Sequence, residues 1–386
     1  MPSNKDMLVK ITILVTSMMT VMAGATIAPS LPEMTRAFPE NANAEALVKL
    51  VLTLPGLFIA ATAPISGWLI DKYGRIPLMI VMLLIYGIAG TAGLYLNTLN
   101  EILVSRAILG IAVGGIMPTS VALIGDYYEG NERQKFLGIQ SGVMALAGTL
   151  FITGGGLLAD IGWRYPFLIY AVAFLAVPLV IIFLKEPKRE KITQSESSQT
   201  VNIPSVAWVV YVLSFLGMVT FYVLPVHIPF LILEVANVGN TAVGIALAFS
   251  TLISGLAAFN YPTLKSRLTH YQIYGISFFL MGIGFLILSQ AGSYFFVFPG
   301  LFIAGAGAGL VMPNSSLCLV TLSTPSSRGK ILGLLTTFIF LGQFASPLFT
   351  GPIVNISSIK MGFLYMAMAI IIVSIIALIR NRRLML

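Results

Sequence analysis

Twelve long runs of apolar residues constrain the fold of this chain more than any other feature of its sequence. A helix needs about 20 apolar residues to cross a bilayer, and each run reaches that length. The runs lie at about 8–31, 46–70, 77–97, 101–124, 136–159, 165–184, 204–234, 241–264, 271–291, 294–322, 329–355 and 360–380. Only 9% of the 386 residues are charged, against about 25% in a soluble domain, so lipid must be the solvent for most of the surface. We therefore expect an all-α polytopic membrane protein with twelve transmembrane helices.

One polar segment, residues 185–202, divides the runs into two sets of six. It is rich in Lys, Glu, Ser and Gln, a composition that cannot bury enough apolar surface to fold on its own. We expect an N-terminal six-helix bundle over residues 1–184, a cytoplasmic linker over 185–203, and a C-terminal six-helix bundle over 204–386.

The basic residues indicate how the helices are oriented. If the N-terminus is cytoplasmic and the runs alternate in direction, 17 of the 22 basic residues fall on the cytoplasmic side. These are Lys5, Lys10, Lys72, Arg75, Arg133, Lys135, Lys185, Lys188, Arg189, Lys191, Lys265, Arg267, Arg328, Lys330, Arg380, Arg382 and Arg383. Membrane proteins show this positive-inside asymmetry. We expect a multi-pass protein of a bacterial cell membrane with both termini cytoplasmic, and the net charge of +8 then needs no nucleic-acid partner.

The two sets of six runs resemble each other in sequence. A shift of 195 residues, without gaps, places residues 106–140 over 301–335. The shift pairs Gly110 with Gly305, Gly114 with Gly309, Met117-Pro118 with Met312-Pro313, Ser120 with Ser315, Arg133 with Arg328, Lys135 with Lys330, and Leu137-Gly138 with Leu332-Gly333. Parallel repeats of this kind build transporters that bind their substrate between the halves, near the middle of the membrane.

The most distinctive local motif lies between the second and third runs. It reads Gly67-Trp-Leu-Ile-Asp71-Lys-Tyr-Gly74-Arg75. The glycines permit a tight turn, Asp71 can cap a neighbouring helix, and Arg75 can pair with Asp126 at the end of the fourth run. The alternative is an ordinary charged turn that only sets topology.

This motif resembles the G-x-L-x-D-x-x-G-R signature of the major facilitator superfamily, and the resemblance extends over twelve runs, the repeat and the central linker. It implies alternating-access transport, with Gly67, Asp71, Gly74, Arg75 and Asp126 as a conformational latch of the outward-open state. In the second half the acidic position is Ser266, between Lys265 and Arg267, so we expect a one-sided latch.

Two further patterns of that family lie in the fourth and fifth runs. Arg106, Gly110 and Gly114 match R-x-x-x-G-x-x-x-G, in which the family's arginine is linked to proton coupling and the glycines allow close packing. The alternative for Arg106 is that it reaches the outer headgroups. The fifth run departs from the pattern of drug antiporters, with Ala147, Phe151 and Ile152 at key positions. The eleventh run fits that pattern better and includes Pro347, which we expect to kink a tightly packed helix.

Few polar residues lie within the runs, and none is an acid at a run's centre. The candidates for the cavity or for coupling are Arg106, Glu33, His227, Glu234, Asn314, Gln343, Met22 and Tyr222. Most embedded amides join helices, as we also expect for Gln140 and Asn260. Pro225 and Pro229 flank His227 and are expected to break the seventh helix, as Pro29 and Pro32 are in the first. Methionines and aromatic residues suggest a soft, apolar cavity.

The leading hypothesis is a monomeric secondary transporter that exports lipophilic or amphipathic drugs in exchange for protons, similar to the multidrug efflux group. Uptake or export of one metabolite or lipid is the alternative within transport. A membrane enzyme or a receptor is a different class: His227 and His270 lie at opposite faces, and no receptor domain is present. The chain has no nucleotide-binding G-x-x-x-x-G-K-[ST] loop and no Cys cluster, so we expect no cofactor and no metal.

Overall fold

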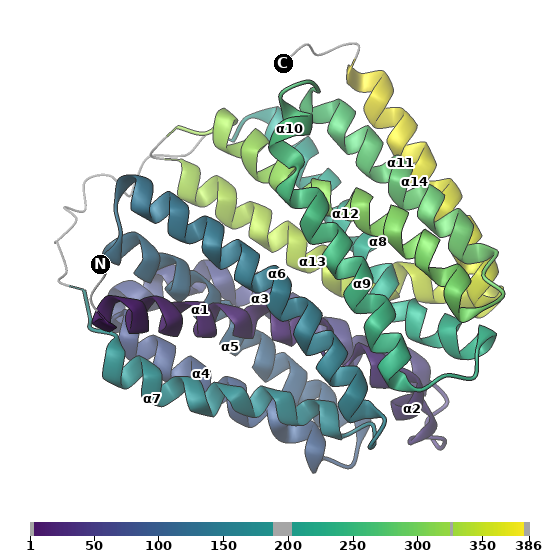
Figure 1. Cartoon of the computed structure of the whole chain (residues 1–386), viewed down its shortest axis with the longest axis horizontal. Helices are drawn as coiled ribbons and strands as arrows, with labels where there is room; N and C mark the ends of the chain where they lie inside the picture. Colours follow the sequence, from purple (N-terminus) through teal and green to yellow (C-terminus); the bar gives the residue numbers. More distant parts are fainter. Residues whose placement is uncertain (1–3, 188–202, 325–326, 382–386) are drawn as a thin grey trace.

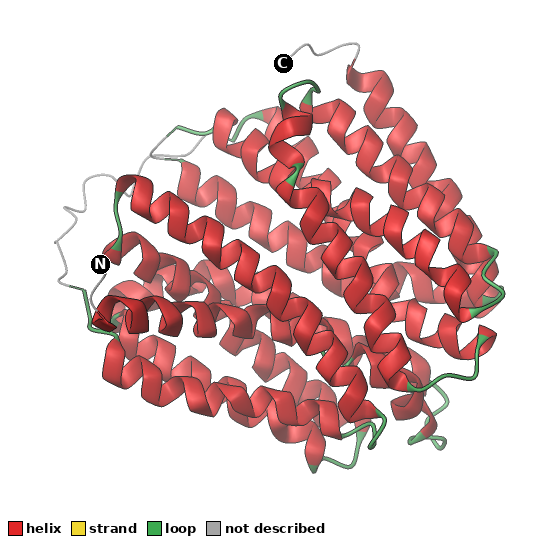
Figure 2. Cartoon of the chain, in the orientation of Figure 1, coloured by secondary structure: helices red, strands yellow, loops and turns green. Residues whose placement is uncertain are grey.

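The computed structural model describes residues 4–187, 203–324 and 327–381, and within these ranges it contains helices and no strands (Figure 2). In the described part, 12 helical segments are long and apolar enough to cross a membrane. The predicted fold class is therefore confirmed. The predicted linker lies almost wholly outside the described residues, and the division into two domains stays a prediction.

Seven α-helices and three short 3₁₀ helices form the described residues 4–187, which we call the first half. They are α1 (Asn4–Ala25), η1 (Ala28–Ser30), α2 (Leu31–Arg36), α3 (Ala44–Tyr73), α4 (Arg75–Thr91), η2 (Ala92–Leu94), α5 (Leu99–Tyr127), α6 (Gly130–Ala159), η3 (Tyr165–Ala171) and α7 (Val172–Phe183).

The described residues from 203 to 381, which we call the second half, are also helical. Their elements are α8 (Ser205–Val235), α9 (Asn240–Phe259), α10 (Tyr261–Lys265), α11 (His270–Ser289), α12 (Tyr294–Leu322), α13 (Arg328–Ile356) and α14 (Ile359–Asn381).

Prolines break the first span but not the seventh. Around Pro29 and Pro32 the chain leaves α1 and continues as η1 and α2, as predicted. The prediction of a break at Pro225 and Pro229 is wrong, because α8 runs without interruption through both. Residues 222–229 are all buried, and packing on every side holds the helix together where one backbone hydrogen bond per proline is missing.

The eighth span is shorter than predicted. The apolar run extends to about residue 264, but α9 ends at Phe259, and the separate α10 begins at Tyr261. Pro262 explains the boundary, because it has no N–H to continue the helix and fits the first turn of a new one. Asn260, predicted to lie within a span, therefore lies at a helix junction, where its side chain donates to the carbonyl of Leu256.

The helices cross the molecule in alternating directions and so define two opposite faces (Figure 1). The basic face is the one at which α1 begins, α3 meets α4, and α5 ends. The α2 face is the opposite one, where α2 lies, α6 ends and α9 begins. Between the halves, α6 packs on α9 and α3 packs on α13, while α2 and η1 contact α8 (Figure 1).

Close helix packing repeats in the two halves. A Cβ on Gly110 would lie 2.5 Å from the carbonyl of Pro55 in α3, and Gly114 lies against Thr62 of the same helix. In the second half, Gly305 and Gly309 lie just as close to the backbone of Ser250 and Ser254 in α9.

Paired hydroxyl groups repeat as well. Thr16 of α1 lies 3.4 Å from Ser120 of α5, and Ser214 of α8 donates to Ser315 of α12 at 2.8 Å. Ser120 and Ser315 are the residues that the 195-residue shift pairs, so the sequence repeat corresponds to equivalent contacts in space.

Candidate functional site

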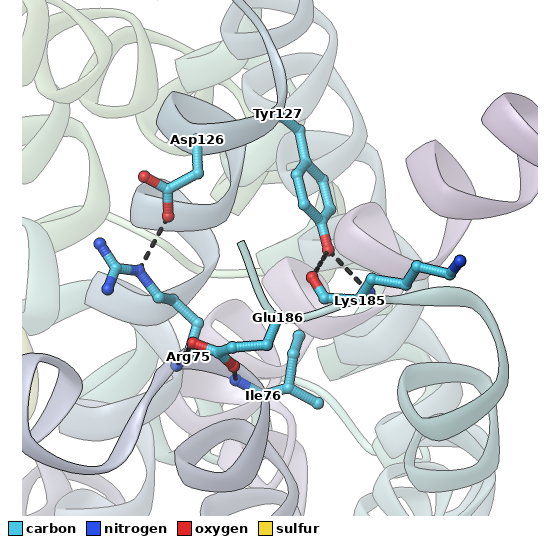
Figure 3. A network of polar contacts seen from close by, with 6 residues as sticks. All are labelled: Arg75, Ile76, Asp126, Tyr127, Lys185 and Glu186. Atoms are coloured by element: carbon cyan, nitrogen blue, oxygen red, sulfur yellow. Dashed lines mark hydrogen bonds and ion pairs between the residues drawn. The ribbon is translucent and has the colours of Figure 1, made fainter. Parts of the chain in front are cut away.

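The turn between α3 and α4 places a cation against the end of α5. Gly74 has a φ of +96°, a backbone conformation that residues with a side chain rarely adopt, and it lets α4 begin immediately at Arg75. The Nε of Arg75 donates to Oδ2 of Asp126 at 2.8 Å (Figure 3). The side chains are 20% and 26% exposed. The structure thus brings together two of the predicted latch residues.

A residue that sequence analysis missed completes this site. Glu186, just after α7, accepts hydrogen bonds from the backbone N–H groups of Arg75 and Ile76, each at 2.8 Å (Figure 3). These are orphan donors of the first turn of α4, at the positive end of the helix dipole, where a carboxylate is most favourable. A Cβ at position 74 would lie 2.8 Å from Oε1 of Glu186, so the glycine also makes room for the cap.

The chain beside Glu186 is fixed to α5. The hydroxyl of Tyr127 accepts a hydrogen bond from the N–H of Lys185 at 2.9 Å and donates one to the carbonyl of Lys185 (Figure 3). The start of α4, the end of α5 and the segment that follows α7 therefore form one network on the basic face. We call these residues, Arg75, Asp126, Tyr127, Lys185 and Glu186, the basic-face network.

Two predicted latch residues lie outside this network. Asp71 is exposed and makes no hydrogen bond or ion pair within the described part of the chain. Gly67 is also exposed, with open space where a Cβ would be. In the second half, His270 begins α11 as Arg75 begins α4, but its Nδ1 bonds at 2.9 Å to Asn314 of α12. Asn314 therefore joins helices near the basic face.

Arg106 is enclosed by protein and does not reach the headgroups. Its side chain is 1% exposed, and Nη2 donates to the carbonyls of Ala89 and Gly90 at 2.9 and 2.8 Å. The guanidinium carbon lies 4.9 Å from the ring centre of Phe167 and 5.0 Å from that of Tyr170. Among the described residues, Nε and Nη1 have no hydrogen-bond partner. A buried cation with unused donors can act on a neighbouring group or on an anion.

Three of the predicted candidates for proton coupling, Glu33, His227 and Glu234, do not form one cluster. His227 is fully buried, and its Nε2 lies 2.7 Å from the hydroxyl of Thr350 in α13. Glu33 accepts a hydrogen bond from the side-chain amide of Asn240 at 2.7 Å. Glu234 is exposed and has no hydrogen bond or ion pair within the described residues. His227 and Glu33 thus each have a hydrogen-bond partner, but on different helices: α13 for His227 and α9 for Glu33.

A second buried cation near the α2 face was not among the predicted site residues. Lys49 of α3 is 2% exposed, pairs with Glu45 at 2.5 Å, and lies 5.0 Å from the ring centre of Phe230 in α8. It therefore contacts the second half. Its position near the start of an apolar run, four residues after a glutamate, is the sequence signal for the pair.

A small cavity lies between the halves, where α1, α6, α8 and α9 meet. It has a volume of about 30 Å³, enough for one water molecule. Its walls are Ala25, Ile152, Phe221, Tyr222, Leu224, Pro225, Leu247, Ser250 and Thr251, so they carry hydroxyl groups but no charge. The hydroxyl of Tyr222 lies against Gly24, where a Cβ would be 2.7 Å away.

The remaining predicted cavity residues are buried but do not line this cavity. Met22 is fully buried in the core. Gln343 of α13 is 2% exposed and packs on Gly56 of α3, so it joins the halves. Pro347 is buried in α13, which continues through it.

Comparison with known proteins matches the chain to one family of membrane proteins over most of its length. The model described as "Major Facilitator Superfamily" matches residues 13–273 and 213–384. The tetracycline resistance protein, class D, of Salmonella ordonez is 26% identical over 356 residues, which are 87% of this chain and 86% of that protein. The multi-drug resistance efflux pump PmrA of Streptococcus pneumoniae is 26% identical over 315 residues, or 78% and 77% of the two chains.

A relative with higher identity matches over a shorter region. Multidrug resistance protein 1 of Bacillus subtilis is 32% identical over 158 residues, and the match spans 40% of each protein. Among solved structures, a bacterial homolog of the human lysosomal transporter Spinster superposes with a TM-score of 0.78 at 16% identity, covering 98% of this chain and 96% of that one. A D-xylose-proton symporter gives 0.77 at 14%, covering 97% of both chains.

Proposed function

The chain belongs to the major facilitator superfamily, and from this premise we propose that it exports lipophilic or amphipathic small molecules in exchange for protons. Membership makes it a membrane transporter, and its described residues contain 12 segments long and apolar enough to cross a membrane. The export direction and the class of compound are supported by relatives named as multidrug and tetracycline resistance proteins that match most of the chain.

The lining of one cavity supports the proposed class of substrate. The small cavity where α1, α6, α8 and α9 meet has walls of aliphatic and aromatic side chains with three hydroxyl groups and no charge. Such walls favour compounds that bind mainly through apolar contact, with a few hydrogen bonds to orient them. The present volume admits no drug, so binding requires the halves to separate at this place.

We assign the basic face to the cytoplasm. The turn from α3 to α4, the start of α6 and the segment after α7 carry Lys72, Arg75, Arg133, Lys135 and Lys185, in keeping with the positive-inside rule. With an even number of spans, both termini are then cytoplasmic.

The basic-face network is our candidate for the conformational latch. In this state Arg75 is paired with Asp126, while Asp71 is exposed and makes no hydrogen bond or ion pair with the described residues. We assign Asp71 a partner in the alternative state, in which the basic face is closed, following the role that the resemblance gives this loop. Gly67 and Gly74 then serve the same loop by allowing the helices to approach.

Proton coupling needs a group that gains and loses a proton. Arginine does not deprotonate in proteins, so Arg106 can only act on a partner or an anion. We therefore assign coupling to the outer rim, at Glu33, His227 and Glu234. The hydrogen bond of Glu33 to Asn240 in the second half supports this assignment, because that contact must change when the halves move. His227 adds a buried imidazole that bonds within the second half to Thr350.

Accumulation in inside-out membrane vesicles tests the direction and the substrate class. Vesicles acidified inside by respiration should take up fluorescent lipophilic dyes, and should not take up a polar sugar or an amino acid. Arg75→Ala, which removes the latch cation, serves as the inactive control. Uptake of the polar solutes alone, with no dye uptake, would instead favour transport of a specific metabolite.

A further inference from the structure

The amino end of α9 has no cap of its own. Gly239 precedes the helix and offers no side chain, so the first N–H groups of α9 need partners from elsewhere. Asp160, which follows α6 in the first half, supplies them. Its Oδ1 accepts from the N–H of Asn240 at 2.6 Å, and its Oδ2 accepts from the N–H of Thr241 at 3.2 Å. The hydroxyl of Thr241 also donates to Oδ2.

Asn240 adds a third segment to this contact. Its side chain is 3% exposed, and its amide nitrogen donates to Oε1 of Glu33 at 2.7 Å and to the carbonyl of Ala159 at 3.2 Å. Thus α2 and the end of α6 both bind Asn240, the first residue of α9.

The backbones of α6 and α9 touch directly below this contact. A Cβ on Gly156 would lie 2.7 Å from the carbonyl of Asn240, and one on Gly244 would lie 2.9 Å from the carbonyl of Ile152. A Cβ on Gly239 would lie 2.9 Å from Oδ1 of Asp160. The geometry therefore requires the two helices to be fully docked, because a small separation would lengthen all the hydrogen bonds together.

These bonds are unusual in their distribution. Within the described residues, every hydrogen bond between the first and the second half involves Asn240 or Thr241. On the basic face, the described residues of the two halves share no hydrogen bond or ion pair. Within the described residues, the hydrogen bonds between the halves thus all lie at the α2 face. The cation–π contact of Lys49 with Phe230 joins the halves near the same face.

We propose that Asp160 caps α9 across the two halves and thereby acts as a clasp that holds the α2 face closed. The clasp consists of Glu33, Asp160, Asn240 and Thr241. It has to break before that face opens, so Asp160 is a positioning residue for alternating access. This role rests on the proposed transport function, but the conformation that it controls can be measured without substrate.

Distances between spin labels test the clasp in the full-length protein in lipid nanodiscs, with Cys318 replaced by Ser. One label pair, at Ile161 and Phe295, reports on the α2 face, and a second, at Tyr73 and Phe259, reports on the basic face; all four positions are exposed. In Asp160→Ala we expect the first distance to lengthen and the second to shorten. A lost helix cap corresponds to a change of about twofold to thirtyfold in the ratio of open to closed molecules.

Two further variants separate a clasp from a general loss of structure. Asp160→Asn keeps an acceptor for the α9 N–H groups and should restore most of the closed population, since Asn caps helices about as well as Asp. Glu40→Ala, an exposed acid on the same face, should behave as wild type. If Asp160→Ala does not fold, Asn240→Ala must show the same shift. Unchanged distances in a folded Asp160→Ala or Asn240→Ala overturn the clasp, whether or not the protein proves to export drugs.

Discussion

The Nε of Arg75 lies 2.8 Å from Oδ2 of Asp126, so an ion pair joins the start of α4 to the end of α5 (Figure 3). A partly exposed pair of this kind contributes little by itself, about 0–1 kcal/mol. Its neighbours make it part of a rigid unit, because Glu186 caps the same helix end and Tyr127 holds the adjoining chain. The latch should therefore respond to changes in any of these residues.

Removal of the Glu186 carboxylate should destabilise the protein. Glu186→Ala loses two hydrogen bonds at the amino end of α4, and the loss of a helix cap costs about 0.5–2 kcal/mol. We expect the thermal unfolding midpoint in detergent to fall by a few degrees. The matched control is Glu129→Ala, an exposed acid on the same face whose side chain makes no capping bond. Equal midpoints for the two variants would show that the cap is dispensable.

Asp71→Asn should separate transport from stability. Because Asp71 has no partner within the described residues in this state, the variant should insert, fold and melt as wild type. If Asp71 accepts a charge-assisted hydrogen bond in the alternative state, its loss costs about 1.5–3 kcal/mol there and should lower transport about tenfold or more. Drug efflux at matched protein abundance gives the answer, and near-normal efflux would defeat the proposal.

The comparison of sequence with structure shows which interactions a sequence can predict. The twelve spans follow from apolar length, and the break at Pro29 and Pro32 follows from the missing N–H of proline. The break expected at Pro225 failed because burial on all sides of α8 outweighs local preference. The eighth span also ended a few residues earlier than expected, at Phe259, because Pro262 starts a new helix within the apolar run.

The caps made by Glu186 and Asp160 could not have been predicted in the same way. Each carboxylate is distant in sequence from the helix that it caps, by about 110 residues for Glu186 and by about 80 for Asp160. Capping motifs are recognised within a few residues along the chain, as for Thr98 and Glu101 at the start of α5. A cap between helices depends on the packing, which local sequence does not reveal.

The rim assignment predicts that proton-driven transport depends on three side chains. Glu33→Gln, His227→Ala and Glu234→Gln should each weaken transport driven by a pH gradient, and the triple variant should abolish it. Glu33→Gln keeps an oxygen that can accept from Asn240, so it tests the proton rather than the contact. A triple variant that still concentrates substrate normally would move the coupling site to another acid, such as Asp126 or Asp160, or to another ion.

Cysteine labelling tests the orientation. In a Cys318→Ser background, a cysteine at Ser197 should react with a membrane-impermeant maleimide only after the cells are lysed, since the segment 185–203 is predicted to be cytoplasmic. Ser197 lies outside the described residues. Glu40→Cys, in the loop between α2 and α3, should react in intact cells. Labelling of Ser197→Cys from outside would reverse the orientation and, with it, the direction of transport.

The exchange of drug for protons is the central claim, and purified protein in liposomes tests it most directly. Liposomes contain a pH-sensitive dye and no ion gradient, and a lipophilic drug is imposed as a gradient across the membrane. The account predicts that drug leaving the lumen drives protons into it, so the lumen acidifies, and that Arg75→Ala abolishes this signal. Drug movement with no change in lumenal pH, while transport remains active, would contradict proton exchange.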